Sequence, residues 1–144
     1  MNRPMFALTL PSDLRMLSVA RTFVEAVCQA CNFERSFLHA LVLATGEAVT
    51  NIVRHAHREM PQAEMQILLE VRADGVVLDF LDQGRPFDIA AVPQLPPGEL
   101  RIGGRGVFLL RTLMDEIASG PRSDCPGNRL RLFKRTSLDV KSAG

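Results

Sequence analysis

Two periods in the spacing of hydrophobic residues predict the secondary structure of the chain. Apolar runs that alternate with polar residues, or continue unbroken for several positions, predict strands at 4–10, 64–74, 75–83 and 128–135. Apolar residues spaced three or four apart predict amphipathic helices at 12–31, at about 34–57 and at 106–119.

Local residue choices indicate where these elements begin, end and connect. Ser12 is the expected N-cap of the first helix. Asp74-Gly75 is typical of a hairpin between the two central strand segments. The third helix is expected to run into a strand near Ile117. Residues 83–105 contain four prolines and four glycines without a clear period, which is typical of a functional or mobile loop.

The resulting order is strand, helix, helix, two strands, long loop, helix, two strands. Because helices do not alternate one for one with strands, we expect a two-layer α/β sandwich, with a mixed, mainly antiparallel sheet and helices packed on one face. A chain of 144 residues has the size of one domain, which we expect to span residues 1–144.

Composition narrows the classes of partner. The net charge of +1 gives no electrostatic case for direct nucleic-acid binding or for an anionic membrane. We found no apolar run near the roughly 20 residues of a membrane span, so we expect a cytoplasmic protein. The three cysteines, Cys28, Cys31 and Cys125, favour buried structural thiols, with a metal or redox role as the alternative.

Polar residues interrupt the second predicted helix at a helical repeat. Glu47, Asn51 and His55 recur every four residues and should therefore lie on one face of an otherwise apolar helix. Such a face can belong to a binding site. It can also be a hydrogen-bonded pair exposed to solvent, or a polar network beneath a loop.

A second cluster lies in FLDQGRPFD, residues 80–88. Asp82 ends an apolar strand, and Gly84 follows two residues later. A carboxylate at a strand end can accept a hydrogen bond from a ligand amine, and a neighbouring glycine lets the backbone come close to that ligand. The same residues also form an ordinary Asp-x-Gly turn in many sheet proteins.

A third cluster, GGRGVFLL at 103–110, combines glycines with the start of a helix. Free backbone N–H groups and the helix dipole at such a start can bind an anion, and Arg105 and Arg101 could add charged hydrogen bonds. A flexible glycine-rich helix entry is the alternative. No Lys-Ser or Lys-Thr follows the glycines, so the segment is not a P-loop.

In this order the three clusters resemble the GHKL (histidine kinase-like) ATPase superfamily. Within it, GEAVTNIVRHAH, DQGRPFD and GGRGVFLLRTLMDEI resemble the bacterial anti-sigma-factor serine/threonine kinases of the RsbW and SpoIIAB type. The resemblance covers roughly residues 7–135 and implies the histidine kinase-like ATPase fold. Pro86 stands where a fuller first glycine box has a second glycine, which should stiffen that turn.

The resemblance also implies site residues. Glu47 would be the catalytic general base, and Asn51 would ligate Mg²⁺ at the phosphates. Asp82 would read the adenine amine, and residues 88–103 would form the ATP lid. His55 is expected to be structural. The implied nucleotide-binding residues are Asn51, Asp82, Gly84, Phe87, Gly104, Arg105 and Gly106.

The implied function is an anti-sigma regulatory factor with ATP-dependent protein serine/threonine kinase activity. ATP or ADP and Mg²⁺ would be its cofactors. It would phosphorylate a STAS-type anti-sigma-factor antagonist and sequester a sigma factor or another response regulator by partner switching, and a homodimer is expected. The alternatives are a non-catalytic ATP-binding module that controls a partner protein, and a scaffold that binds no nucleotide.

Overall fold

Five antiparallel strands form one sheet in the order β1-β2-β3-β5-β4. The computed structural model describes residues 4–57, 59–60, 62–86 and 104–136, with only the backbone described for 104–107. All four strand pairings in this part of the chain are antiparallel, so the expected admixture of parallel pairs is not found. The strands are β1 Met5–Pro11, β2 Glu64–Val71, β3 Gly75–Asp82, β4 Glu116–Pro121 and β5 Asn128–Arg135.

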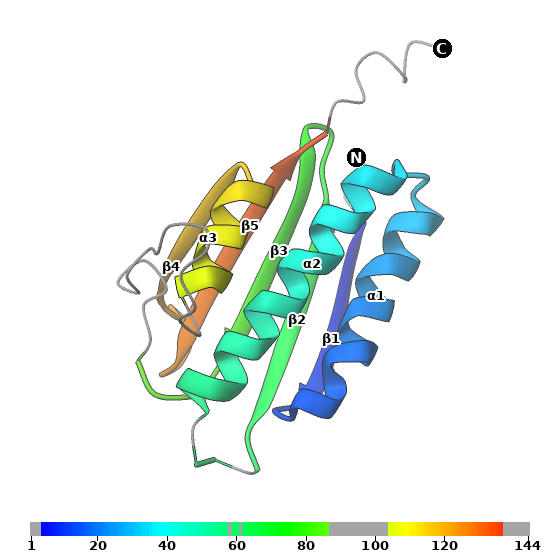
Figure 1. Ribbon diagram of the computed structural model, residues 1–144. Helices are drawn as coiled ribbons and strands as arrows, with labels where there is room; N and C mark the ends of the chain where they lie inside the picture. The colour runs from blue at the N-terminus through cyan, green and yellow to red at the C-terminus, as the bar shows by residue number, and fades with distance from the viewer. Residues whose placement is uncertain (1–3, 58, 61, 87–103, 137–144) are drawn as a thin grey trace.

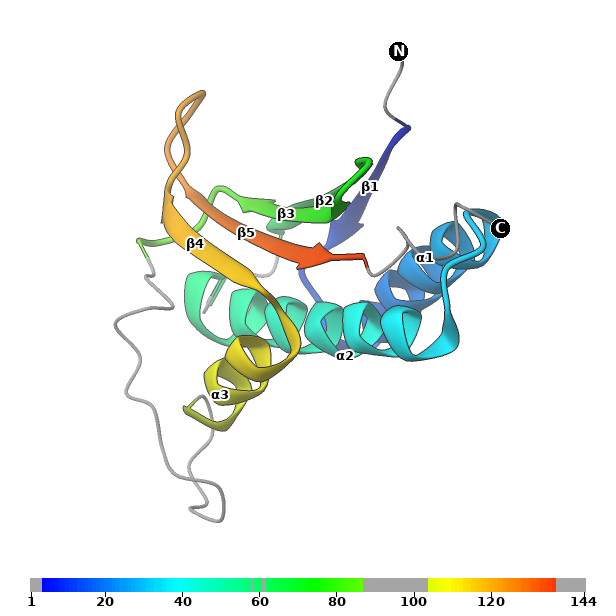
Figure 2. The same ribbon diagram turned by 90° about the horizontal axis from the view of Figure 1, so that it is seen from above.

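The helices lie together against one face of this sheet. Figure 2 shows the strands as one layer and α1, α2 and α3 as the other, and Figure 1 shows α2 between α1 and α3. This arrangement confirms the predicted two-layer α/β sandwich. The helices are η1 Leu14–Met16, α1 Leu17–Ala30, α2 Arg35–Asn51, the π-helical turn η2 Ile52–Ala56, and α3 Gly104–Leu113.

The core lies between the two layers because alternate residues of each strand point toward the helices. From β3, Leu78 and Phe80 are fully buried there, and Leu132 of β5 lies beside Leu78 in register. Leu41 and Val49 of α2 are also fully buried in this core. The site described below lies at one end of this interface, where β3 and α2 both end.

Two predicted element ends differ from the structure. Asp13, and not Ser12, caps the first helical segment, because its carboxylate accepts the Arg15 N–H at 2.8 Å. The third helix ends at Leu113, whose carbonyl accepts from Lys134 Nζ at 2.9 Å, and β4 then begins at Glu116. The predicted strand near Ile117 and the hairpin between β2 and β3 are confirmed.

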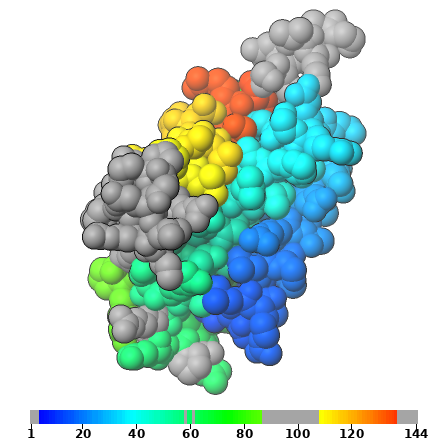
Figure 3. Space-filling model, viewed as in Figure 1, coloured from blue at the N-terminus to red at the C-terminus, as the bar shows by residue number. Residues whose placement is uncertain are grey.

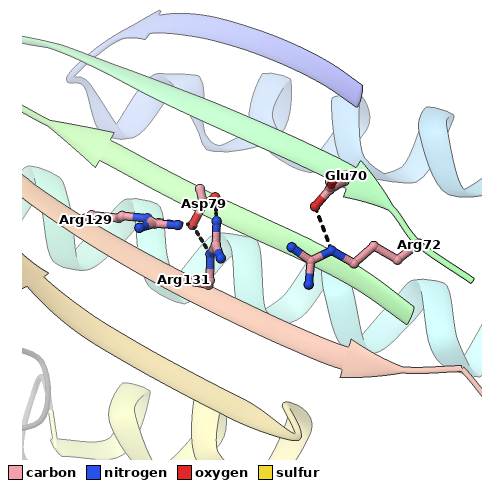
Figure 4. Close-up of polar contacts among 5 residues, drawn as sticks. All are labelled: Glu70, Arg72, Asp79, Arg129 and Arg131. Atoms are coloured by element: carbon pink, nitrogen blue, oxygen red, sulfur yellow. Dashed lines mark hydrogen bonds and ion pairs between the residues drawn. The ribbon is translucent and has the colours of Figure 1, made fainter. Parts of the chain in front are cut away.

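The outer face of the sheet carries charged residues instead of a second helical layer in the described chain (Figure 4). Asp79 is 8% exposed and accepts hydrogen bonds from Arg129 Nε at 3.2 Å and from Arg131 Nε and an Arg131 terminal nitrogen, each at 2.9 Å. Burial acts to raise the pKa of Asp79, but the bonds from Arg131 and Arg129 outweigh it and hold that pKa below its usual value.

One helical stretch is long and apolar enough to cross a membrane by length and composition alone. It is Arg35–Ala56, which joins α2 and η2, and the sequence reading had identified no such run. In the structure 56% of an 18-residue window of this stretch is buried, and Leu41 and Val49 belong to the hydrophobic core. A core helix passes the same test, so the length carries no case for a membrane span.

The cysteines only partly follow the prediction of buried thiols. Cys28 is fully buried in α1, whereas Cys31 and Cys125 are half-buried, and all three are free. Burial, and to a lesser extent Cys31, raises the pKa of Cys28 to about 12, so its thiol stays protonated and unreactive near neutral pH.

Candidate functional site

The end of α2 brings Glu47 and Asn51 to the edge of the core. They lie one turn apart on the same helix, with Glu47 half-buried and Asn51 only 5% exposed. The π-helical turn η2 begins at the next residue, and its wider hydrogen bond joins His57 N–H to the Ile52 carbonyl. His55 lies on this turn and is exposed, so it does not share the burial of Asn51.

The end of β3 supplies the second cluster. Asp82 is 3% exposed, and its Oδ1 accepts the Gly84 N–H at 2.8 Å and the Asn128 Nδ2–H at 2.9 Å. Among the described residues, both hydrogen bonds to the Asp82 carboxylate are accepted by Oδ1. Its Oδ2 can therefore accept a hydrogen bond from a ligand.

The turn after Asp82 packs directly on the end of η2. Arg85 N–H donates to the Ala56 carbonyl at 2.9 Å. A Cβ on Gly84 would lie 2.3 Å from that carbonyl oxygen and 2.7 Å from the imidazole Cδ2 of His57. Glycine is therefore required by the close approach of two backbones, and the Asp-x-Gly turn fixes β3 to the helix that carries Asn51.

His57 packs beside this contact between the turn and η2. It is 4% exposed, and its Nδ1 lies 2.7 Å from Ser12 Oγ. Burial lowers the pKa of His57, and the nearby Asp82 opposes that shift. The imidazole is therefore neutral near neutral pH, and the sequence prediction overlooked it in favour of the exposed His55.

A small cavity joins the first two clusters. Its volume is about 20 Å³, close to the space of one water molecule. The Nδ2 of Asn51 is buried without a hydrogen-bond partner among the described residues. The cavity is lined by Ala48, Asn51, Ile52, Asp82, Ser119, Asn128, Arg129 and Leu130.

A larger hollow of about 380 Å³ lies elsewhere. It is bounded by His57, Gln83 and Arg122, and neither Asn51 nor Asp82 is among the residues that line it. The small cavity is therefore the better candidate site, because it holds a buried carboxylate and an unpartnered carboxamide facing the same space.

The third cluster is only partly described. α3 begins at Gly104, two residues before the predicted start, so Gly104, Arg105 and Gly106 lie in its first turn. α3 lies alongside α2 in both views (Figures 1 and 2), and Figure 3 shows the three helices forming one face of the molecule. The side chain of Arg105, together with Phe87, Arg101 and the predicted lid at 88–103, lies outside the described residues.

Asn128 lines the candidate site, and sequence reasoning missed it. It begins the alternating segment NRLRLFKR, and its position pairs with Asp82 across the sheet. It is 8% exposed on the helix-facing side of β5. An uncharged polar residue at an inward strand position was the available signal, but its partner depends on the strand register, which the sequence did not provide.

The donor set fits a nucleotide better than a metal bound by protein alone. The described residues contain no cluster of three histidines, cysteines or carboxylates able to hold a metal ion. The orphaned amide of Asn51 offers a donor to an oxygen, while its carbonyl is the kind of ligand that Mg²⁺ takes alongside phosphate oxygens and water. Asp82 offers an acceptor to an amine at the other wall of the cavity.

Three curated relatives of the chain are named serine-protein kinase RsbW. This chain is 29% identical over 116 residues to the serine-protein kinase RsbW of Oceanobacillus iheyensis, and the match covers 75% of this chain and 73% of that one. It is 30% identical over 118 residues to the RsbW of Listeria innocua, covering 76% and 75%. The match to the RsbW of Halalkalibacterium halodurans extends over 145 residues at 28% identity, covering 95% and 88%.

Solved structures share the fold. The RsbU and RsbW domains of a Mycobacterium tuberculosis protein match with a TM-score of 0.64 at 16% identity, covering 92% of this chain and 32% of that longer chain. A histidine kinase domain from Erythrobacter litoralis matches with a TM-score of 0.55 at 16% identity, covering 91% and 64%. The sequence model of the family described as "Histidine kinase-like ATPase domain" matches residues 10–134. The chain therefore belongs to the histidine kinase-like ATPase domain family.

Proposed function

We propose that this protein is an ATP-dependent protein serine/threonine kinase that also regulates a partner protein. The observation that carries the proposal is the pairing of a buried carboxylate, Asp82, with an unpartnered buried carboxamide, Asn51, across one cavity. The curated relatives named serine-protein kinase, which align with about three quarters of the chain or more, support the kinase assignment.

In this proposal the small cavity marks the inner end of a nucleotide site that extends beyond it, and Asp82 and Asn51 recognise different parts of the nucleotide. Asp82 Oδ2 accepts the exocyclic amine of adenine, while Gly84 lets the turn approach the base. Asn51 holds the phosphate end together with Mg²⁺, which supplies charge neutralisation when bound. Phe87 and the first turn of α3, with Gly104, Arg105 and Gly106, complete the nucleotide site.

Glu47 is the proposed general base. It lies one helical turn before Asn51 and is half-buried, so its carboxylate can reach both the site and a protein substrate that docks from outside. It would accept the proton of the acceptor serine or threonine hydroxyl as that oxygen bonds to the γ-phosphorus and the bond to the β–γ bridging oxygen breaks, which releases ADP. The chain's contribution is then positioning and charge stabilisation, as in other phosphoryl-transfer enzymes.

The proposed acceptor is a STAS-type anti-sigma-factor antagonist, and the proposed regulated partner is a sigma factor. The ATP-bound protein would hold the sigma factor, and the ADP-bound protein would prefer the antagonist. We expect the active unit to be a homodimer, and a monomeric mass by light scattering at micromolar concentration would contradict that part.

Two substitutions on one face of α2 test the proposal. Glu47→Ala should leave ATP affinity within a few fold while transfer from γ-labelled ATP to the antagonist falls by about 10²–10⁴, the usual contribution of a positioned base. Asn51→Ala should weaken MgATP binding and transfer together. Full transfer by Glu47→Ala would refute the base assignment. Wild-type protein that binds MgATP and a partner but transfers nothing would establish the non-catalytic module instead.

A further inference from the structure

We infer that Asn128 is a positioning residue that makes the site select 6-amino purines over 6-oxo purines, by fixing the orientation of the Asp82 carboxylate. The inference rests on the proposed contact between Asp82 and adenine. Nothing in the sequence motifs assigns Asn128 a role, and the two hydrogen bonds that carry the inference are both made to described residues.

The Asn128 side chain donates two hydrogen bonds, and we call this arrangement the Asn128 clamp. Asn128 Nδ2 donates to Asp82 Oδ1 at 2.9 Å and to the Arg85 carbonyl at 2.6 Å. Asp82 and Asn128 are direct partners in the pairing of β3 with β5, so the two side chains meet without any loop between them. Both residues are at least nine-tenths buried, which keeps water from competing for these bonds.

The hydrogen bond from Asn128 to Asp82 Oδ1 determines which oxygen of the Asp82 carboxylate faces the ligand. Oδ1 accepts from Gly84 N–H as well as from Asn128, so rotation of the carboxylate would break two hydrogen bonds at once. Oδ2 is therefore held as a fixed acceptor. The 6-amino group of adenine can donate to Oδ2. The 6-oxo group of hypoxanthine is another acceptor, so neither that oxygen nor Oδ2 gains a hydrogen bond.

The second hydrogen bond of the Asn128 clamp holds the turn against the sheet. The Arg85 carbonyl lies three residues after Asp82, and Arg85 N–H is bound to the Ala56 carbonyl of η2. Asn128 thus ties β5, the 82–85 turn and the end of the Asn51 helix into one rigid unit. A site built on rigid elements discriminates better, because a misfit ligand cannot be accommodated by movement.

The experiment compares ADP with IDP, which differ at the purine 6-position. Calorimetric titration of the full chain should show wild-type protein binding ADP at least about tenfold more tightly than IDP. Asn128→Ala should weaken ADP by about tenfold, the scale of a lost hydrogen bond to a charged group, and leave IDP within about twofold. Ser123→Ala, an exposed change in the loop before β5, is the matched control and should alter neither affinity.

Asn128→Asp gives a second, independent readout. Near neutral pH the introduced carboxylate faces Asp82 with no proton to donate, and ADP binding should be weak. On acidification the pair takes up a proton, and an O–H donor is restored to Oδ1. ADP affinity relative to wild type should therefore rise between about pH 7 and pH 5, a recovery that a merely structural role for Asn128 would not produce.

The outcomes separate the inference from the proposal beneath it. Folded wild-type protein that binds no adenine nucleotide would remove both. Wild-type selectivity for ADP that persists in Asn128→Ala, or an equal loss of ADP and IDP, would overturn the role of Asn128 alone. If Asn128→Ala does not fold, the pH response of Asn128→Asp decides, and a flat response relative to wild type would refute the inference.

Discussion

At the scale of single residues, the molecule buries polar groups in two places for different reasons. Asp82, Asn51 and Asn128 lie on the helix side of the sheet around a cavity, with one amide nitrogen left without a described partner. Asp79 lies on the opposite face, where two arginines occupy both of its oxygens (Figure 4). The first arrangement suits a ligand, and the second suits stability.

Asp79→Asn should destabilise the fold without changing nucleotide affinity. The neutral amide cannot replace the charged bonds to Arg129 and Arg131, and the free energy of unfolding should fall by about 1–2 kcal/mol, since the arginines remain about 40% exposed. Urea unfolding measures the change. Asp124→Asn, which removes a mostly exposed partner of Arg122, is the comparison and should lower the midpoint by less than Asp79→Asn does.

The pKa of Asp79 also predicts how this contribution depends on pH. Because the pKa of Asp79 is lower in the folded than in the unfolded protein, its bonds to Arg129 and Arg131 stabilise the fold fully above about pH 4, the pKa of the unfolded chain. The contribution is lost as pH falls through the lower folded pKa. The stability difference between wild type and Asp79→Asn should therefore shrink in acid, and a difference that grew on acidification would contradict the assignment.

At the scale of elements, the contact between η2 and the turn after β3 aligns the two walls of the site. Gly84→Ala should disturb it, because the added Cβ would meet the Ala56 carbonyl at 2.3 Å and must displace a backbone. We expect a loss of about 1–3 kcal/mol in stability and weaker nucleotide binding. Gly120→Ala is the matched control, since nothing lies within 4 Å of its added Cβ. Equal behaviour of the two variants would refute this account of the turn.

The same elements show what sequence could and could not predict. Period-two and helical apolar spacing predicted four of the strands and the three helices, because burial on one face dictates both periods. The remaining strand, β4, was expected only as a continuation of the third helix near Ile117. The π-helical turn could not be seen, since Ile52 and Val53 continue the helical pattern through it. The hydrogen bond between Asn128 and Asp82 depends on the register of β5 on β3, and the two residues are 46 positions apart in the sequence. Ser12 does not cap the first helical segment because its hydroxyl lies against His57, and Asp13 caps that segment instead.

At the scale of the whole molecule, the two-layer fold separates a helical face from a charged sheet face. The candidate site lies between the layers, at the end where α2 passes into η2 and β3 reaches Asp82. A ligand there contacts both layers at once. Nucleotide binding is therefore expected to stabilise the complete fold, by a free energy that rises with the logarithm of ligand concentration above Kd.

The most direct test of this account is calorimetric titration of MgADP into wild-type protein and into Asp82→Asn, with folding of both checked by circular dichroism. Wild-type protein should bind, and Asp82→Asn should bind at least about tenfold more weakly, because the amide can turn a donor toward the adenine amine. Folded wild-type protein that binds no adenine nucleotide, or an Asp82→Asn variant that binds as tightly as wild type, would contradict the central claim that this cavity reads adenine through Asp82.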